Sequence, residues 1–125
     1  MTTTAPATPA TDLELLAPAG TLAAFEAALE AGADAVYVGA PGLNARALAR
    51  DFTFAEIAAM THHAHGLGKR LYVAMNSLVK EGELRLALEN LEAFARIGPD
   101  ALIIQDLGLL HLARRFFPEL RLHAS

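Results

Sequence analysis

The strongest constraint on the fold is a regular alternation of short apolar runs with amphipathic stretches along the chain. Gly32, Gly66 and Gly98 each follow an amphipathic stretch and lie 34 and 32 residues apart, which is about the length of one strand–helix unit. The turns at 32–35 and 98–101 also share the pattern Gly-x-Asp-Ala. Such a repeat predicts parallel strands that are joined by helical crossovers.

Local patterns place the individual elements. Apolar runs that end in Gly or Pro predict strands, and apolar residues at helical spacing predict helices. Thr53 and Glu56 form a capping box at the start of the second helix, and Phe52 and Ile57 flank it as a hydrophobic staple. We expect strands at 13–17, 35–38, 71–75, 101–104 and 120–123, and helices at 21–32, 53–65, 83–96 and 107–116.

Two parallel α/β architectures agree with this pattern. A dinucleotide-binding or phosphate-binding sheet would carry a glycine motif after its first strand, but the turn at 18–21 reads Pro-Ala-Gly-Thr. A five-stranded flavodoxin-like sheet fits the chain length. The N-terminal half of a TIM-type barrel, with about four strand–helix units and a fifth strand, fits equally. A complete barrel needs at least roughly 200 residues, so this alternative implies missing strands on a longer protein, or a second chain.

Composition excludes several classes of protein. The chain has 125 residues, of which 54% are hydrophobic, and this favours one domain with a dense core. We expect the Thr/Ala/Pro-rich residues 1–12 to form a disordered tail and residues 13–125 to form the domain. No signal peptide or membrane span is evident, so a cytoplasmic protein is expected. The net charge of −4 argues against strong nucleic-acid binding by this chain alone.

The carboxyl ends of the strands predict where a ligand binds, since parallel sheets bind ligands beyond those ends. Amides and a guanidinium suit a small anionic or oxygen-rich ligand, and an imidazole can act as a general acid or base. The predicted substrate-binding residues are Asn44, Arg46, Asn76 and Gln105, and the predicted catalytic residues are His123 and Asp106.

Each of these residues also has a simpler interpretation. Asn44 and Asn76 can cap turns, and Arg46 can be an ordinary surface side chain. Asp106 stands directly before a predicted helix and is a normal N-cap there. His123 can simply end a strand at the boundary of a longer barrel.

Two patterns resemble known catalytic or metal sites only superficially. The His-His-x-His run at 62–65 lies in the last turn of a helix, where histidines interact well with the helix dipole. No carboxylate is evidently placed to complete that group, so we expect no metal. Ser77, His123 and Asp106 offer the residue types of a catalytic triad, but Ser77 lacks a nucleophile elbow and a serine hydrolase is not expected.

Six segments, taken in order, resemble peptidase family U32, the collagenase-like family of unassigned catalytic type. The resemblance covers about Leu13 to Ser125. It rests on LLAPAG at 15–20, GADAVYVG at 32–39, NAR at 44–46, YVAMN at 72–76, IQDLG at 104–108 and LHAS at 122–125.

The resemblance implies a TIM-type barrel in this region, and it favours the half-barrel over the flavodoxin-like sheet. It also implies the label of a protease, although other members are linked to hydroxylation of tRNA, ribosomal RNA or the ubiquinone ring, with prephenate as a participant in the RNA cases. Relatives continue well beyond the motif at 122–125, and several hold an iron–sulfur cluster on later cysteines. This chain has no cysteine, so we expect no cofactor within it.

These observations lead to one main prediction and two alternatives. The main prediction is the N-terminal half-barrel of a protease-like protein, with a site for a small anionic ligand or peptide at its strand ends. One alternative is part of a prephenate-linked RNA or quinone hydroxylation protein. The other is a non-catalytic half-barrel that forms a homodimer through its open strand edges. An RNA partner is left open.

Overall fold

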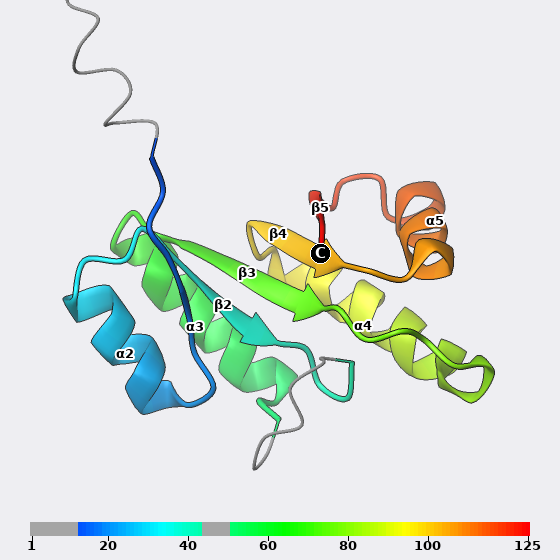
Figure 1. Ribbon diagram of the computed structural model, residues 1–125, viewed down its shortest axis with the longest axis horizontal. Helices are drawn as coiled ribbons and strands as arrows, with labels where there is room; N and C mark the ends of the chain where they lie inside the picture. Colours follow the sequence, from blue (N-terminus) through cyan, green and yellow to red (C-terminus); the bar gives the residue numbers. More distant parts are fainter. Residues whose placement is uncertain (1–12, 44–50) are drawn as a thin grey trace, which may run out of the picture.

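The computed structural model describes residues 13–43 and 51–125, so the expected tail at 1–12 lies outside the described residues. Strands and helices alternate along the chain (Figure 1). They are β1 (Leu16–Pro18), α2 (Leu22–Glu30), β2 (Ala35–Gly39), α3 (Phe54–Gly66), β3 (Arg70–Met75), the short 3-10 helix η1 (Glu81–Glu83), α4 (Leu84–Ile97), β4 (Ala101–Ile104), α5 (Leu107–Phe116) and β5 (Leu122–Ala124).

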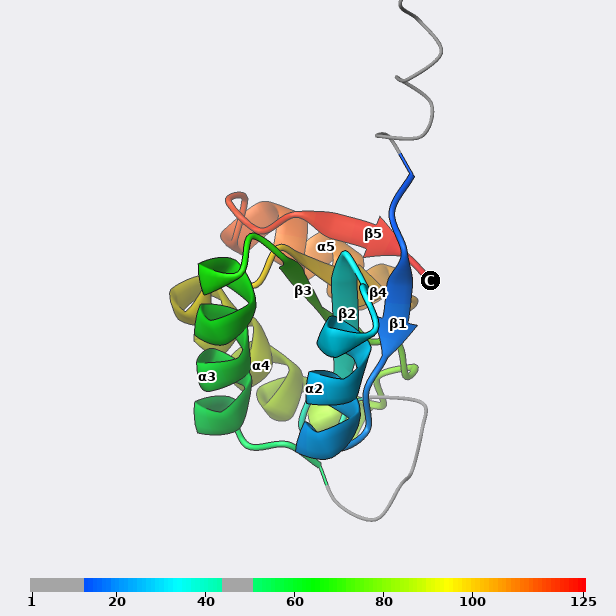
Figure 2. The same ribbon diagram turned by 90° about the vertical axis from the view of Figure 1, so that its left-hand side faces the viewer.

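The strands form one sheet with the order β1-β2-β3-β4-β5, and all neighbouring strands are parallel. This order confirms the half-barrel and excludes the flavodoxin-like alternative, in which the first strand would lie inside the sheet. Figure 2 shows the sheet curling from β1 to β5, with the helices on its outer side. The sheet is not closed, so it corresponds to half of a TIM-like barrel.

The two faces of the sheet carry different side chains. Alternate residues of each strand point to opposite faces, and the outward set packs against all of α2, α3, α4 and α5 in one buried cluster. That cluster includes Val36, Val38, Leu71, Val73, Met75, Leu102 and Ile104 from the strands, and Phe25, Ile57, Leu91, Phe94 and Leu109 from the helices. The concave face carries a smaller cluster of Ala35, Tyr72 and Ala101, with Tyr37 and Ile103 against it.

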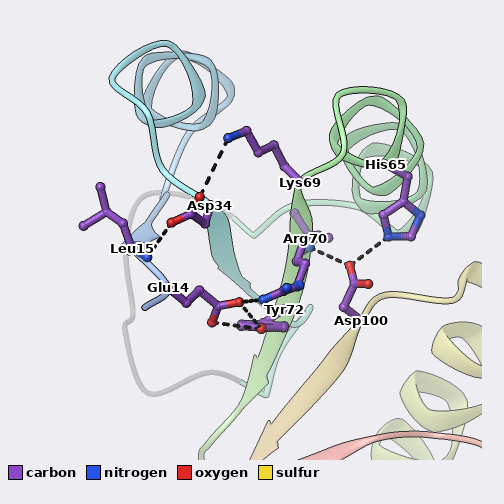
Figure 3. Close-up of polar contacts among 9 residues, drawn as sticks. Glu14, Leu15, Asp34, His65, Lys69, Arg70, Tyr72 and Asp100 are labelled. Atoms are coloured by element: carbon purple, nitrogen blue, oxygen red, sulfur yellow. Dashed lines mark hydrogen bonds and ion pairs between the residues drawn. The ribbon is translucent and has the colours of Figure 1, made fainter. Parts of the chain in front are cut away.

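The repeated Gly-x-Asp-Ala turns have the same structural role at the N-terminal ends of the strands. The Asp34 N–H donates to the Leu15 carbonyl oxygen over 2.8 Å, and Asp34 Oδ2 accepts from the Leu15 N–H over 2.8 Å. Asp100 makes the same two bonds with Leu71, again at 2.8 Å each. We call these two arrangements the aspartate clamps (Figure 3). Each clamp joins the start of one strand to the turn before its neighbour.

The two largest differences from the predicted strand boundaries are at the starts of the first and fifth strands, and the other strand ends differ by at most one residue. The first strand was expected at 13–17 but begins at Leu16, because both polar backbone groups of Leu15 are bonded within the first clamp. The fifth strand was expected from residue 120 but begins at Leu122. The Leu120 N–H donates to the Phe117 carbonyl oxygen, so Leu120 belongs to a turn.

Helix termini follow the sequence signals closely. The Thr53 hydroxyl accepts from the Glu56 N–H over 3.1 Å, and Glu56 Oε1 accepts from the Thr53 N–H over 2.9 Å, which confirms the capping box. Phe52 and Ile57 are both buried in the outer cluster. Within the described ranges, no helix combines the length and the apolar character needed to cross a membrane.

Candidate functional site

The polar residues at the carboxyl ends of the strands share one edge of the sheet, because all strands are parallel. Asn76 directly follows β3 and is half-buried, whereas Gln105 directly follows β4 and is exposed. Ser125 follows β5, and its N–H donates to the Ile104 carbonyl oxygen over 2.9 Å. The predicted residues Asn44 and Arg46 lie outside the described residues.

A groove of about 740 Å³ runs along the open edge formed by β5 and α5. It brings together Gln105 and His123, two of the predicted site residues, and adds the Arg114 guanidinium and the Ser125 hydroxyl. The lining contains no Asp or Glu side chain among the described residues. Its apolar part consists of Ile104, Leu107, Leu110, Pro118, Leu120, Leu122 and Ala124. An apolar wall with a few convergent polar groups is typical of small-molecule sites.

Arg114 was missed by the sequence reasoning, which considered only residues near the ends of the strands. Its position in the last turn of α5 brings it to the groove because Pro118 and the following turn lead the chain back into β5. A basic residue at the end of a helix also has an ordinary structural explanation, so the sequence alone did not single it out.

His123 lies on the concave side of β5, where its backbone pairs in register with Ile103. Its imidazole meets the Tyr72 ring edge-on, with 5.3 Å between ring centroids and 69° between ring planes. Within the described part of the chain, His123 hydrogen-bonds to neither Asp106 nor Ser77. The three residue types of a catalytic triad are therefore present without the contacts of a triad.

Asp106 is engaged by main-chain groups from two different segments. Its Oδ1 accepts from the Leu109 N–H over 2.8 Å and caps α5, while Oδ2 accepts from the Val79 N–H over 2.9 Å. These two hydrogen bonds, that from Leu109 first, lower the pKa of Asp106 below its ordinary value. The ionised carboxylate thus holds the loop that follows β3 against the start of α5.

Two histidines of the run at 62–65 contact residues from other elements. His65 Nε2 lies 2.8 Å from Asp100 Oδ2, in the second clamp, and the His63 ring is 6.1 Å from the Phe25 ring. Sequence reasoning missed Asp100 as a neighbour because it is 35 residues further along the chain. No three His, Asp or Glu side chains of the described ranges are grouped so that they could hold a metal ion.

A polar cluster of Glu14, Arg70 and Tyr72 lies on the concave face (Figure 3). The Tyr72 hydroxyl donates to Glu14, at 2.8 Å from Oε2 and 3.0 Å from Oε1, and Arg70 forms an ion pair with the same carboxylate. Burial raises the pKa of Tyr72, and the hydrogen bond to Glu14 adds to this effect. Sequence reasoning missed this cluster because Glu14 and Tyr72 are 58 residues apart.

Comparison with known proteins places this arrangement in a family. The chain is 40% identical over 112 residues to tRNA hydroxylation protein P of Escherichia coli, covering 90% of this chain and 25% of the relative. It is 40% identical over 113 residues to a 23S rRNA 5-hydroxycytidine synthase of the same organism, covering 90% and 17% respectively. A collagenase of Porphyromonas gingivalis is 30% identical over 112 residues, covering 89% and 27%.

The chain thus spans 17% to 27% of the length of these relatives. No solved structure matches it. The sequence model of one family, described as peptidase family U32, matches residues 20–125, which is nearly all of the half-barrel. The chain belongs to peptidase family U32.

Proposed function

We propose that this chain is the N-terminal half-barrel of an RNA-hydroxylation protein and that its strand ends bind a small carboxylate-bearing ligand. The observation that carries this proposal is the groove beside β5, where Arg114, Gln105 and His123 line one space without an acidic neighbour among the described residues. The names of two relatives, which are 40% identical to the chain, favour RNA hydroxylation. We also propose a cytoplasmic location for the protein, as an RNA substrate would require.

The lining fits an anion with a carbon ring. Arg114 offers two parallel N–H donors to a carboxylate, and Gln105 and Ser125 offer further hydrogen bonds. Leu107, Leu110 and Leu122 provide apolar contact for the ring. Prephenate, a six-membered ring with one carboxylate on the ring and a second on its pyruvyl side chain, has this chemistry and is the ligand that the family resemblance implies. Asn44, Arg46 and Asn76 stay predicted contacts from the other strand ends.

The predicted catalytic residues have different parts in this proposal. His123 is the group that gives or takes a proton at the ligand, since its imidazole is exposed at the groove. Asp106 acts through the main chain that it holds, because both of its oxygens accept backbone N–H groups. The cysteine-free sequence does not fit an iron–sulfur cluster, so no step of this proposal uses one.

A peptidase activity has less support from the residues in hand. A serine peptidase needs a nucleophile that hydrogen-bonds to its base. Ser77 and His123 lack that bond in the described part of the chain. Identity does not decide between the two activities, because a Methanocaldococcus jannaschii relative named as an uncharacterized protease is 40% identical, as are the relatives named for RNA hydroxylation.

Titration calorimetry of the purified chain with prephenate tests the proposal. We expect saturable binding at one site, and binding about tenfold weaker in Arg114→Ala, since a charge-assisted hydrogen bond contributes at least ~1.5 kcal/mol. Arg115→Ala is the matched control, because Arg115 lies outside the groove with its guanidinium 5.4 Å from the Phe116 ring centroid. No saturable binding, or equal losses in both variants, would overturn the proposal.

A specific observation favours self-association as a second function. Residues 13–34, at the open β1 edge, contain four acidic residues and no Lys or Arg. Glu14 and Asp34 pair with Arg70 and Lys69 of the same chain, so Glu26 and Glu30 are the acidic groups of this segment that face a partner. Residues 107–125, at the open β5 edge, contain three Arg and one Glu. We propose that the β5 edge of one copy pairs with the β1 edge of a second copy, since open edges can pair and the opposite charges are complementary.

Light scattering at two salt concentrations tests this pairing. We expect a dimer at low salt that dissociates at about 1 M NaCl, where the screening length falls to roughly 3 Å. Glu26→Lys with Glu30→Lys, on α2, should abolish the dimer without unfolding the chain, because both side chains are exposed. A monomer under all conditions would contradict the pairing.

A further inference from the structure

The polar cluster on the concave face connects three parts of the sheet that are far apart in sequence. Glu14 lies just before β1, Tyr72 lies in β3 and His123 lies in β5. Tyr72 contacts both of the others: its hydroxyl donates to Glu14 over 2.8 Å, and its ring lies 5.3 Å from the His123 ring. The cluster therefore spans the open side of the half-barrel from its first strand to its last.

Strand register explains why these side chains share one face. Ile103 pairs with Ala74 on one side and with His123 on the other, so His123 and Ala74 face the same way. Tyr72 is two residues before Ala74 and therefore lies on that face as well. The Tyr72 and His123 side chains therefore lie on the same face, two residues apart in register, and their rings are in contact.

We propose that Glu14 and Tyr72 are positioning residues that hold the His123 imidazole in one orientation at the groove. This inference rests on the proposed acid–base role of His123. Glu14 fixes the Tyr72 hydroxyl, and the fixed Tyr72 ring presents its face or edge to the imidazole in one T-shaped arrangement. Neither residue lines the groove itself, and Tyr72 reaches it only through the His123 ring.

The surroundings make this support rigid. Tyr72 is 6% exposed, so its ring has little space in which to turn. The Glu14 side chain is 26% exposed and is held from a second direction by Arg70. A T-shaped arrangement is a favoured geometry for two aromatic rings, so this contact favours one orientation of the imidazole over others.

Side-chain NMR of the histidine ring carbons and protons tests the inference. A ring edge-on to Tyr72 carries a ring-current displacement, and His123→Gln identifies which signal belongs to His123. We expect Glu14→Ala to reduce this displacement although Glu14 does not touch His123. Glu14→Gln should retain it, since the Gln amide oxygen can still accept from the Tyr72 hydroxyl. Glu26→Ala, an exposed carboxylate on α2, is the matched control and should leave the signal unchanged.

A His123 signal that keeps its position in Glu14→Ala would overturn the inference. If Glu14→Ala does not fold, as judged by circular dichroism, Tyr72→Phe decides the question, because it keeps the ring and removes only the hydroxyl bond to Glu14. Reduced displacement in Tyr72→Phe supports positioning, and an unchanged signal contradicts it. The readout needs no ligand, so a failure of prephenate binding would sink the proposed function without changing this result.

Discussion

The two ends of the sheet are built on different principles. At the N-terminal ends, Asp34 and Asp100 repeat one arrangement with the same 2.8 Å bonds to Leu15 and Leu71. At the carboxyl ends, each strand is followed by different residues, and a groove opens beside the last one. In barrels of this type, function lies at the carboxyl ends and the other end serves stability. Repetition at one end and variety at the other agree with that division.

The comparison also shows that a carboxylate at a strand end is not by itself a catalytic group. Asp106 is at the carboxyl ends, yet both of its oxygens accept backbone N–H groups, whereas each clamp aspartate accepts one such group through Oδ2. They also differ in what each joins: a clamp joins neighbouring strands, whereas Asp106 joins the loop after β3 to α5. The groups left for chemistry beside the groove are neutral or cationic.

Removing the second clamp should have the largest effect on stability. Asp100→Ala leaves the N–H of fully buried Leu71 without its carboxylate partner and removes the contact with His65. We expect the free energy of unfolding to fall by about 2 kcal/mol, measured by urea denaturation. Asp100→Asn keeps an acceptor and should lose less. A loss below about 0.5 kcal/mol in Asp100→Ala would contradict the conclusion that the N-terminal ends of the strands serve stability.

Asp106→Ala should cost about 1 kcal/mol at pH 7, the usual value of an N-cap. Because the pKa of Asp106 is lowered in the folded chain, its contribution is complete above the ordinary carboxyl pKa of about 4. It is lost as the pH falls through the lowered value. The difference between wild type and Asp106→Ala in urea denaturation should therefore shrink below pH ~4. A difference that grows on acidification would contradict the assigned charge state.

Asp34→Ala should cost less than Asp100→Ala, about 0.5–1 kcal/mol, although the two clamps have equal distances. Leu15 is 58% exposed, so water can replace the lost carboxylate at its N–H. The ion pair lost with Lys69 is long, at 3.9 Å between Nζ and Asp34 Oδ1, and such a partly exposed pair contributes little to stability. Urea denaturation of both variants under the same conditions measures the two losses in the free energy of unfolding. Equal losses would show that exposure does not distinguish the two clamps.

Gln105→Ala should have the smallest effect on stability, within about 0.5 kcal/mol, because the side chain is exposed beyond β4. The same variant should weaken prephenate binding in calorimetry, since Gln105 lines the groove. If Gln105→Ala lowers stability but leaves prephenate binding unchanged, Gln105 has a structural role like that of the clamp aspartates and does not bind the ligand.

Much of the fold followed from local sequence signals. The capping box of Thr53 and Glu56 and the cap at Asp106 depend on residues three apart, and both were predictable. Strand ends were less predictable, because a clamp or a turn takes backbone groups that the apolar pattern assigns to a strand. Leu15 and Leu120 show this at opposite edges of the sheet.

For the candidate site, the sequence predicted only that polar residues at the carboxyl ends of the strands would lie along one edge of the sheet. Two residues predicted from the strand ends, Gln105 and His123, line one groove, and their role as ligand contacts stays a prediction. Their partners come from distant segments: Arg114 reaches the groove through the turn after α5, and Tyr72 reaches His123 across the curled sheet. Such contacts depend on the curvature of the sheet, which periodicity and spacing do not encode.

The most direct test of the account is to map prephenate on the chain by backbone NMR. Titration should shift the amide signals of Gln105, His123 and Ser125 together, with one dissociation constant. Signals of Asp34 and Asp100, at the other end of the sheet, should stay in place. Shifts centred on the two clamps, or no shifts at any ligand concentration, would contradict a ligand site at the carboxyl ends of the strands.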